Sequence, residues 1–188
     1  MGQVVQFEQQ AVATLRARLG AAEEANEDLI AFARGHSDAV ASINAAVLEA
    51  IEADSLEDLL DIIANRWPDI LGIDLVAIAL MVGGQAFRAD QNAIERVEAA
   101  FVGRMLAHCP RVEIRSVNSG HALFGAPAAA SVRAEALIRI DGAPSYPTGL
   151  IVLGQREALS IASSHGSELL LFLGKVVAAT VRRCVTNR

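Results

Sequence analysis

One pair of adjacent side chains in this 188-residue chain has obvious chemistry: His108 beside Cys109, in the stretch AHCP. An imidazole beside a thiol can favour the reactive thiolate, and a cysteine can also carry a covalently attached cofactor. Pro110 offers a structural explanation, because the residue before a proline is pushed out of the helical region, so a helix should stop at about His108. The end of a helix, with a small buried thiol, is therefore the preferred interpretation, and we assign no catalytic residue.

A second group of candidates alternates along two predicted strands and could bind a ligand. Guanidinium groups offer paired donors to a carboxylate or a phosphate, which favours an anionic or nucleotide-like ligand. The alternative is a solvated strand face on which a glutamate pairs locally with an arginine. A long segment rich in Gly, Ala and Pro, residues 118–131, could close over such a pocket or be a plain connector. The candidate ligand-binding residues on the strands and in this segment are Arg115, His121, Phe124, Arg133, Glu135 and Arg139.

The remaining metal-ligating residues are scattered. Cys109 and Cys184 are far apart and form no CxxC motif, which is typical of free thiols in a reducing compartment. The four histidines form no HxxxH or HExxH cluster. The sequence therefore predicts no metal site and no cofactor.

Charge and hydropathy exclude two classes of partner. The net charge is −6, and the only Lys/Arg run is Arg182-Arg183, so nucleic-acid binding is not expected. The longest apolar run, 75–82, is far shorter than the ~20 residues of a membrane-spanning helix. No secretory signal is recognisable at the N-terminus. We expect a cytoplasmic protein with no membrane contact.

The first 52 residues predict a helical arm. Apolar residues recur there at spacings of three and four, and Asn26 at a core position is typical of a short parallel coiled coil. The alternative is an amphipathic helix that lies on its own domain. The arm carries three Arg and eight Asp or Glu, which favours an exposed helix. The residues predicted to mediate dimerisation are Val12, Leu15, Leu19, Asn26 and Leu29.

Residues 53–188 predict a single α+β domain with helices first, a sheet next and a closing helix. Ser55 should cap a helix that Pro68 ends or kinks, and residues 92–108 and 163–185 show further helical periods. Segments 73–82 and 148–154 are apolar on both faces, so we expect them to pair at the centre of an antiparallel sheet. The other predicted strands are 112–117 and 132–140, and Gly83-Gly84 should form a turn.

Two stretches carry a family resemblance. GLIVLGQREALSIASSHGSELLLFLGKVV resembles the C-terminal signature of the uncharacterised bacterial family called domain of unknown function 484, and LFGAPAAASVRAEALIRI resembles its preceding loop and strand. The resemblance covers about residues 11–185 and is weakest over 83–117. It departs from the family at Ile161, Ser163 and Cys184. It implies a GAF-like fold: a six-stranded antiparallel sheet, helices on one face, a ligand-sized pocket on the other, and an N-terminal helix that often dimerises.

The expected function is a non-enzymatic, GAF-like regulatory or sensory module that forms a homodimer through its arm and binds an unidentified small molecule. The first alternative is a ligand-free dimeric scaffold or adaptor. A more distant alternative is a thiol-dependent reductase using Cys109, similar to GAF-like free methionine sulfoxide reductases, which would need a second, resolving thiol. Bilin attachment, as in phytochrome-type GAF domains, generally uses Cys followed by His, and here the order is reversed.

Overall fold

The computed structural model describes residues 18–20, 23–24, 26–27, 35, 37–107, 109–141, 147–157 and 164–186. The chain divides into two compact units, residues 1–40 and 41–188. In the first unit the described residues are helical, and Leu19 and Asn26 are exposed. Val12, Leu15 and Leu29 lie outside the described residues, so pairing through the arm stays a prediction.

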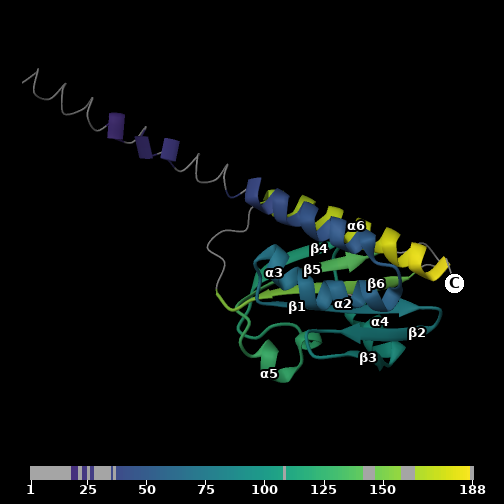
Figure 1. Ribbon diagram of the computed structural model, residues 1–188. Coiled ribbons are helices and arrows are strands. Elements are labelled where there is room, and N and C mark those ends of the chain that lie inside the picture. Colours follow the sequence, from purple (N-terminus) through teal and green to yellow (C-terminus); the bar gives the residue numbers. More distant parts are fainter. Residues whose placement is uncertain are drawn as a thin grey trace, which may run out of the picture. The chain divides into compact units, whose positions relative to one another are not determined.

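The second unit is built on a six-stranded sheet in the order β3-β2-β1-β6-β5-β4, with every neighbouring pair antiparallel (Figure 1). This confirms the predicted α+β class and the antiparallel sheet flanked by helices. The strands are β1 (Leu75–Val82), β2 (Gln85–Ala89), β3 (Ile94–Val97), β4 (Val112–Ser116), β5 (Ala134–Ile140) and β6 (Thr148–Gln155).

The centre of the sheet is formed by β1 and β6, as their two apolar faces predict. They pair from Leu75 opposite Gly154 to Met81 opposite Thr148. Gly83 and Gly84 then form the two-residue turn of the β1–β2 hairpin, and both have positive φ, at 56° and 78°. Such turns twist in the same sense as the strands that they join, and they favour glycine for that reason.

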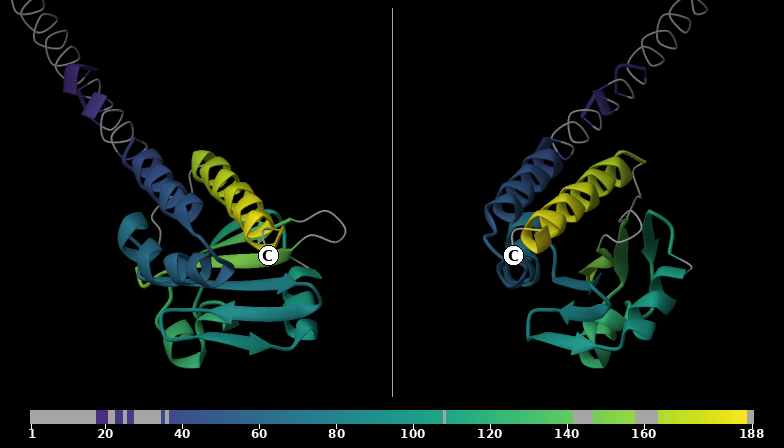
Figure 2. Two further views of the ribbon diagram at one scale, coloured as in Figure 1. Left: turned by 45° about the vertical axis from the view of Figure 1, so that its right-hand side comes forward. Right: turned by 90° about the vertical axis from the view of Figure 1, so that its right-hand side faces the viewer.

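One face of the sheet is covered by the helix over residues 41–52, by α2 (Leu56–Asp61) and by α6 (Ser164–Thr186) (Figures 1 and 2). A π-helical segment, η1 (Ile62–Arg66), joins α2 to α3 (Trp67–Leu71). We call the core on this face the helix-side core. Its fully buried members include Leu59, Ile63, Trp67, Ile78, Ile138, Ile151, Leu173 and Val177.

The start of α2 follows the predicted cap with one difference. The Asp58 backbone N–H donates to Ser55 Oγ at 3.1 Å. The Asp58 carboxylate accepts from the backbone N–H of Asp54 at 3.0 Å, one residue earlier than in a standard capping box. The first contact satisfies an amide that the first helical turn leaves without a partner, and the second fixes the residue before the cap.

The 41–52 helix packs on its own domain. Ile43, Val47 and Ala50, which continue the heptad pattern, are buried in the helix-side core, so here the amphipathic alternative describes the helix. Its C-terminal carbonyls are bound by α6, because Arg183 Nη2 donates to Ile51 O and Ala53 O, each at 2.7 Å. The predicted arm boundary at residue 52 therefore falls inside the second compact unit.

The opposite face of the sheet is covered by α4 (Ala99–Ala107) and by two short helices, η2 (Ala122–Phe124) and α5 (Ala126–Ala129). Their apolar side chains form a second core with the strands, which we call the loop-side core. Its buried members include Leu75, Ala77, Val102, Leu106, Leu123, Phe124, Val132, Leu137, Leu150 and Val152.

The predicted helix over 92–108 is wrong in its first half. Residues 94–97 form the edge strand β3, which pairs with β2 from Ala89 opposite Ile94 to Ala86 opposite Val97. The predicted cap at Asn92 is replaced by Asp90, whose Oδ1 accepts from the backbone N–H groups of Asn92 and Ala93. This turn directs the chain back along β2, and the helix begins only at Ala99.

Candidate functional site

The candidate site lies on the loop-side face, where residues 118–131 cross the sheet. We call these residues the covering segment. The structure gives it two short helices instead of the structureless loop that its composition suggested. Leu123 is fully buried and Phe124 is 4% exposed, and both insert into the loop-side core. The segment thus packs as a cover over the sheet.

A buried carboxylate binds the first turn of the covering segment. Glu135 on β5 lies opposite Arg115 on β4, and its side chain is 1% exposed. Arg115 Nε and Nη2 donate to Glu135 Oε1 at 2.8 and 2.7 Å. The backbone N–H of His121 donates to the other oxygen, Oε2, at 2.6 Å. The hydrogen bond from Arg115 to Glu135 raises the pKa of Arg115, so the guanidinium is cationic at neutral pH.

The imidazole of His121 is part of the same attachment. Its Nδ1 accepts from the backbone N–H of Leu123 at 3.2 Å, which caps η2. Burial lowers the pKa of His121 below its ordinary value of 6.5, although the Glu135 carboxylate acts in the opposite direction. Neutral His121 is therefore the form that fits the fold, because a protonated Nδ1 cannot accept this hydrogen bond.

We expect the pH dependence of the free energy of unfolding to include a contribution from His121. The folded-state pKa of His121 is lower than the unfolded value, so its contribution is present above about pH 6.5 and is lost as the pH falls below it. We expect His121→Asn, whose amide oxygen can cap the same turn, to flatten the decline in the free energy of unfolding between about pH 6.5 and 5. Urea unfolding of both proteins across this range measures it. Parallel curves would contradict the assignment.

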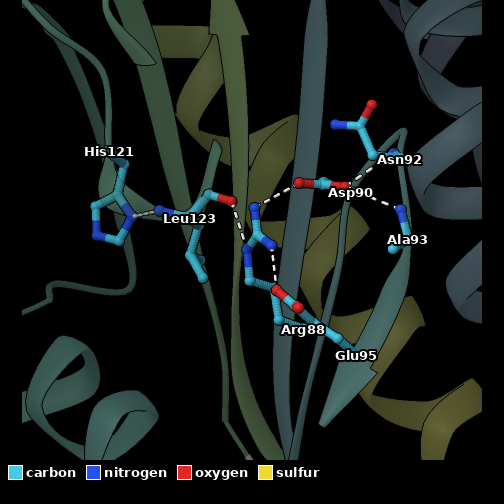
Figure 3. A network of polar contacts seen from close by, with 7 residues as sticks. All are labelled: Arg88, Asp90, Asn92, Ala93, Glu95, His121 and Leu123. Atoms are coloured by element: carbon cyan, nitrogen blue, oxygen red, sulfur yellow. Dashed lines mark hydrogen bonds and ion pairs between the residues drawn. The ribbon is translucent and has the colours of Figure 1, made fainter. Parts of the chain in front are cut away.

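A second attachment, absent from the sequence predictions, is centred on Arg88 of β2 (Figure 3). Its Nε donates to the carbonyl oxygen of Leu123 at 2.9 Å. The two other nitrogens bind the carboxylates of Asp90 and Glu95. Arg88 and Asp90 are mostly buried, with side chains 14% and 10% exposed. Their spacing of two, which places both on one face of a strand, is the signal that could have found them.

Arg133, which precedes β5, and Arg139 on β5 bind partners other than Glu135. Arg133 Nη1 donates to the carbonyls of Asn118 and Ala130 at 3.1 and 2.9 Å, and so it holds the two ends of the covering segment together. Arg139 Nη1 donates to Leu106 O at 3.0 Å, at the end of α4, and its Nε donates to Asp141 at 2.7 Å. The structure therefore brings Arg115, His121, Phe124 and Glu135 together, but it does not bring Arg139 to them.

The fit between the covering segment and the sheet is close. A Cβ atom at Gly154 of β6 would lie 2.8 Å from Cζ of Phe124, and one at Gly120 would lie 2.7 Å from Cβ of Val132. Real Cβ atoms do not approach other atoms so closely, so both positions need glycine. The absence of these two side chains lets the segment lie directly on the strands.

The two thiols lie on different sides of the sheet. Cys109 belongs to the loop-side core, whereas Cys184 is on α6, which covers the other face. Burial raises the pKa of both thiols. Cys109 is therefore not activated, and no neighbouring imidazole can be assigned, because His108 lies outside the described residues.

Within the described part of the chain, no three side chains of His, Cys, Asp or Glu gather in a way that could hold a metal ion. Among the helices of the described ranges, none has the length and apolar character needed to cross a bilayer.

Solved structures of GAF domains share this architecture. The GAF domain of a phosphoenolpyruvate-protein phosphotransferase from Coxiella burnetii is 14% identical, with a TM-score of 0.55 over 81% of this chain and 97% of that chain. The GAF domain of a putative sensor histidine kinase from Pseudomonas syringae pv. tomato is 14% identical, with a TM-score of 0.52 over 82% and 92%. These likenesses show that the second unit has the GAF fold.

A third solved structure, the free methionine-R-sulfoxide reductase from Neisseria meningitidis in complex with its substrate, is 11% identical, with a TM-score of 0.52 over 81% of this chain and 92% of that chain. No curated protein matches the chain. The resemblance in the two quoted stretches is confirmed by a match over nearly the whole chain. Residues 1–186 match the model of the family described as protein of unknown function, DUF484, and the chain belongs to that family.

Proposed function

We propose that this protein is a non-enzymatic regulatory module of GAF fold that binds a small molecule between the sheet and the covering segment. In this proposal ligand binding changes how the segment lies on the loop-side face, and the change reaches the helices on the other face through the strands. The observation that carries the proposal is the way in which the segment is attached, by side chains of Glu135 and Arg88.

A ligand can replace the side-chain contacts that hold the covering segment. The backbone N–H of His121 and the carbonyl of Leu123 are bound by charged side chains from β5 and β2, and not by a neighbouring strand. A ligand that offers its own acceptor to the amide, or its own donor to the carbonyl, can replace either contact without breaking the strand pairing of the sheet.

The buried charge of Glu135 supports a binding role. Removing a carboxylate from water is costly, and a buried ion pair often gives less stability than apolar side chains of the same volume. Arg115, its partner, is 41% exposed, so one end of the pair can be reached from solvent. A ligand with a cationic or hydrogen-bond-donating group would gain a desolvated carboxylate by displacing Arg115.

The functions of two proteins with similar structures also support the proposal. One of the two GAF domains comes from a putative sensor histidine kinase, and the proposal extends a sensory role from it to this chain. The methionine-R-sulfoxide reductase was solved with its substrate, so this fold accommodates a small molecule. The proposal assigns no catalytic step to Cys109, because burial raises the pKa of its thiol.

A second candidate function is a ligand-free dimeric scaffold. The filled space beneath the covering segment favours it, because Leu123 and Phe124 occupy the position between the segment and the strands. In a scaffold this packing would be permanent. In a sensor it would be one of two arrangements whose free energies differ by a few kcal/mol.

A thermal-shift screen of metabolites and cyclic nucleotides separates these candidates. A ligand present at 100 times its Kd should stabilise the fold by ~2.7 kcal/mol. We expect such a shift for the wild type and its loss in Glu135→Gln, which keeps the shape of the side chain and removes its charge. Glu98→Gln, which removes the same charge at an exposed position directly before α4, is the charge-matched control. A screen without any shift would favour the scaffold, whereas a shift that survives in Glu135→Gln would place the ligand away from the covering segment.

Dimerisation through the arm has its own test. Leu19→Glu places a charge at a predicted core position of the coiled coil, and we expect a monomeric mass by light scattering. Leu48→Glu is the matched control, because Leu48 is similarly exposed but lies outside the heptad core, so it should leave the dimer intact. Monomers from Leu48→Glu alone would place the interface on the second unit.

A further inference from the structure

A cavity of about 350 Å³ lies on the helix-side face, between α6 and the ends of β4, β5 and β6. Its walls are formed by Arg111, Arg139 and Asp141 on the side of the strands and by Gly174, Lys175 and Arg182 on the side of the helix. The volume is within the range of small-molecule sites, which begins at roughly 300 Å³. The covering segment contributes nothing to it, so this cavity is separate from the candidate site described above.

The shape of the cavity follows from small residues on α6. A Cβ at Gly174 would lie 2.7 Å from Cγ2 of Ile138 and 3.5 Å from the carbonyl oxygen of Arg139, so glycine lets the helix approach β5 closely. Ala178 and Ala179, one turn further on, also line the cavity and leave its centre open. An apolar floor with charged walls results.

The charge of the walls is strongly one-sided. Three cationic residues, Arg111, Lys175 and Arg182, line the cavity with a single carboxylate, in a chain whose net charge is −6, whereas the guanidinium of Arg139 donates to Leu106 O on the other face. That carboxylate, Asp141, already accepts from Arg139 Nε at 2.7 Å and pairs with Arg111 Nε at 3.6 Å. Lys175 is exposed and forms no ion pair with any described residue. Concentrated cations beside an apolar floor favour an anion.

We propose that this cavity binds a small organic molecule with a phosphate or carboxylate group. The oxyanion lies between the ammonium of Lys175 and the guanidinium of Arg111, whose planar fork matches a carboxylate or phosphate. The organic part contacts the alanine side chains and Gly174 of α6. The ligand thus contacts both α6 and the strands, at the place where α6 carries glycine and alanine.

Phenyl phosphate is a suitable probe, because it combines an apolar ring with a doubly charged oxyanion. We expect saturable binding to the full-length chain by calorimetry at low ionic strength, and weaker binding as salt is added. Phenol, which has the ring without the charge, should not bind. Benzoate should bind more weakly than phenyl phosphate because it carries one charge.

Single charge-removing variants locate the site. Lys175→Gln and Arg111→Gln should each weaken phenyl phosphate binding by about tenfold, which is the effect of about 1.4 kcal/mol. Arg104→Gln removes the same charge from α4, on the opposite face of the sheet, and should leave the affinity unchanged. Equal losses in Lys175→Gln and Arg104→Gln, or the absence of saturable binding, would overturn the proposal.

This test is independent of the proposed function. Glu135→Gln, which should remove ligand shifts at the covering segment, should not alter phenyl phosphate affinity, because Glu135 faces the loop-side core. A loss of phenyl phosphate binding in Glu135→Gln, with no loss in Lys175→Gln, would instead assign the oxyanion to the candidate site and would overturn the cavity assignment.

Discussion

Replacing Arg88 with methionine is expected to lower the free energy of unfolding by about 3 to 5 kcal/mol. Methionine keeps much of the apolar stem but leaves the Asp90 carboxylate, 8% exposed as a residue, without its cationic partner. The carbonyl of Leu123 also loses its donor. Urea unfolding followed by circular dichroism gives the difference, as a fall in the midpoint at constant slope.

Two variants make this prediction specific. Arg96→Met, on the neighbouring strand, removes an exposed guanidinium that lies 6.0 Å from the ring of Phe87 and should cost no more than about 1 kcal/mol. Adding Asp90→Asn to Arg88→Met removes the unpaired charge and should recover part of the loss, as a double-mutant cycle measures. A full-sized loss in Arg96→Met, or no recovery in the double variant, would show that the buried pair is not the cause.

The second large effect is expected at Gly149, near the start of β6. A Cβ there would lie 2.3 Å from the carbonyl oxygen of Ala79 and 2.6 Å from Cδ2 of Leu80. The oxygen belongs to central strand β1, whose pairing with β6 and β2 prevents it from moving. Overpacking of a core typically costs 1 to 3 kcal/mol, and a rigid backbone atom places Gly149→Ala at the top of that range or above it, at about 3 kcal/mol.

The matched control is Gly103→Ala in α4, where a Cβ meets nothing within 4 Å. Alanine is the better helix former, so this variant should stabilise the protein by up to about 1 kcal/mol. The same chemical change is thus predicted to have opposite signs at two positions, and urea midpoints compare them directly. A Gly149→Ala midpoint equal to the wild type would show that β1 and β6 are less closely paired than described.

The strands that are buried on both faces could be predicted from the sequence. Residues 75–82 and 148–154 are apolar on both faces, and only a central position in a covered sheet satisfies such a pattern. Ser55 is a local signal that acts through the backbone, so the start of α2 could be recognised from a single residue, whereas Pro68 lies in the first turn of α3 and the helical run continues to Leu71. These features need no information from distant parts of the chain.

The edge strand β3 carried no comparable signal. In β3 only Val97 is even partly buried, so its side chains report no alternating face. Ile94 and Val97 are three residues apart, a spacing that also fits one face of a helix, and the real helix follows directly. The wrong boundary of the 92–108 helix therefore came from a short strand that is defined by pairing with β2, and pairing is a contact that periodicity cannot report.

In the candidate site, too, the sequence predicted one part and missed another. Arg115 and Glu135 were placed on one polar face by alternation, and the structure pairs them across neighbouring strands. The attachment of Arg88 to Leu123 joins residues 35 apart in the sequence, and it depends on the path of the covering segment. Side chains that bind backbone atoms of a distant segment leave no residue-type pattern, which is why this half of the site was missed.

The chain has a single tryptophan, and its surroundings make it an internal optical reporter. Trp67 is fully buried, and its indole Nε1 donates to the carbonyl of Ala46 at 3.1 Å, which joins α3 to the helix that enters the domain. If that helix shifts, water reaches the ring and its emission moves to longer wavelengths. Movements at this junction can thus be recorded without a dye, separately from events on the opposite side of the sheet.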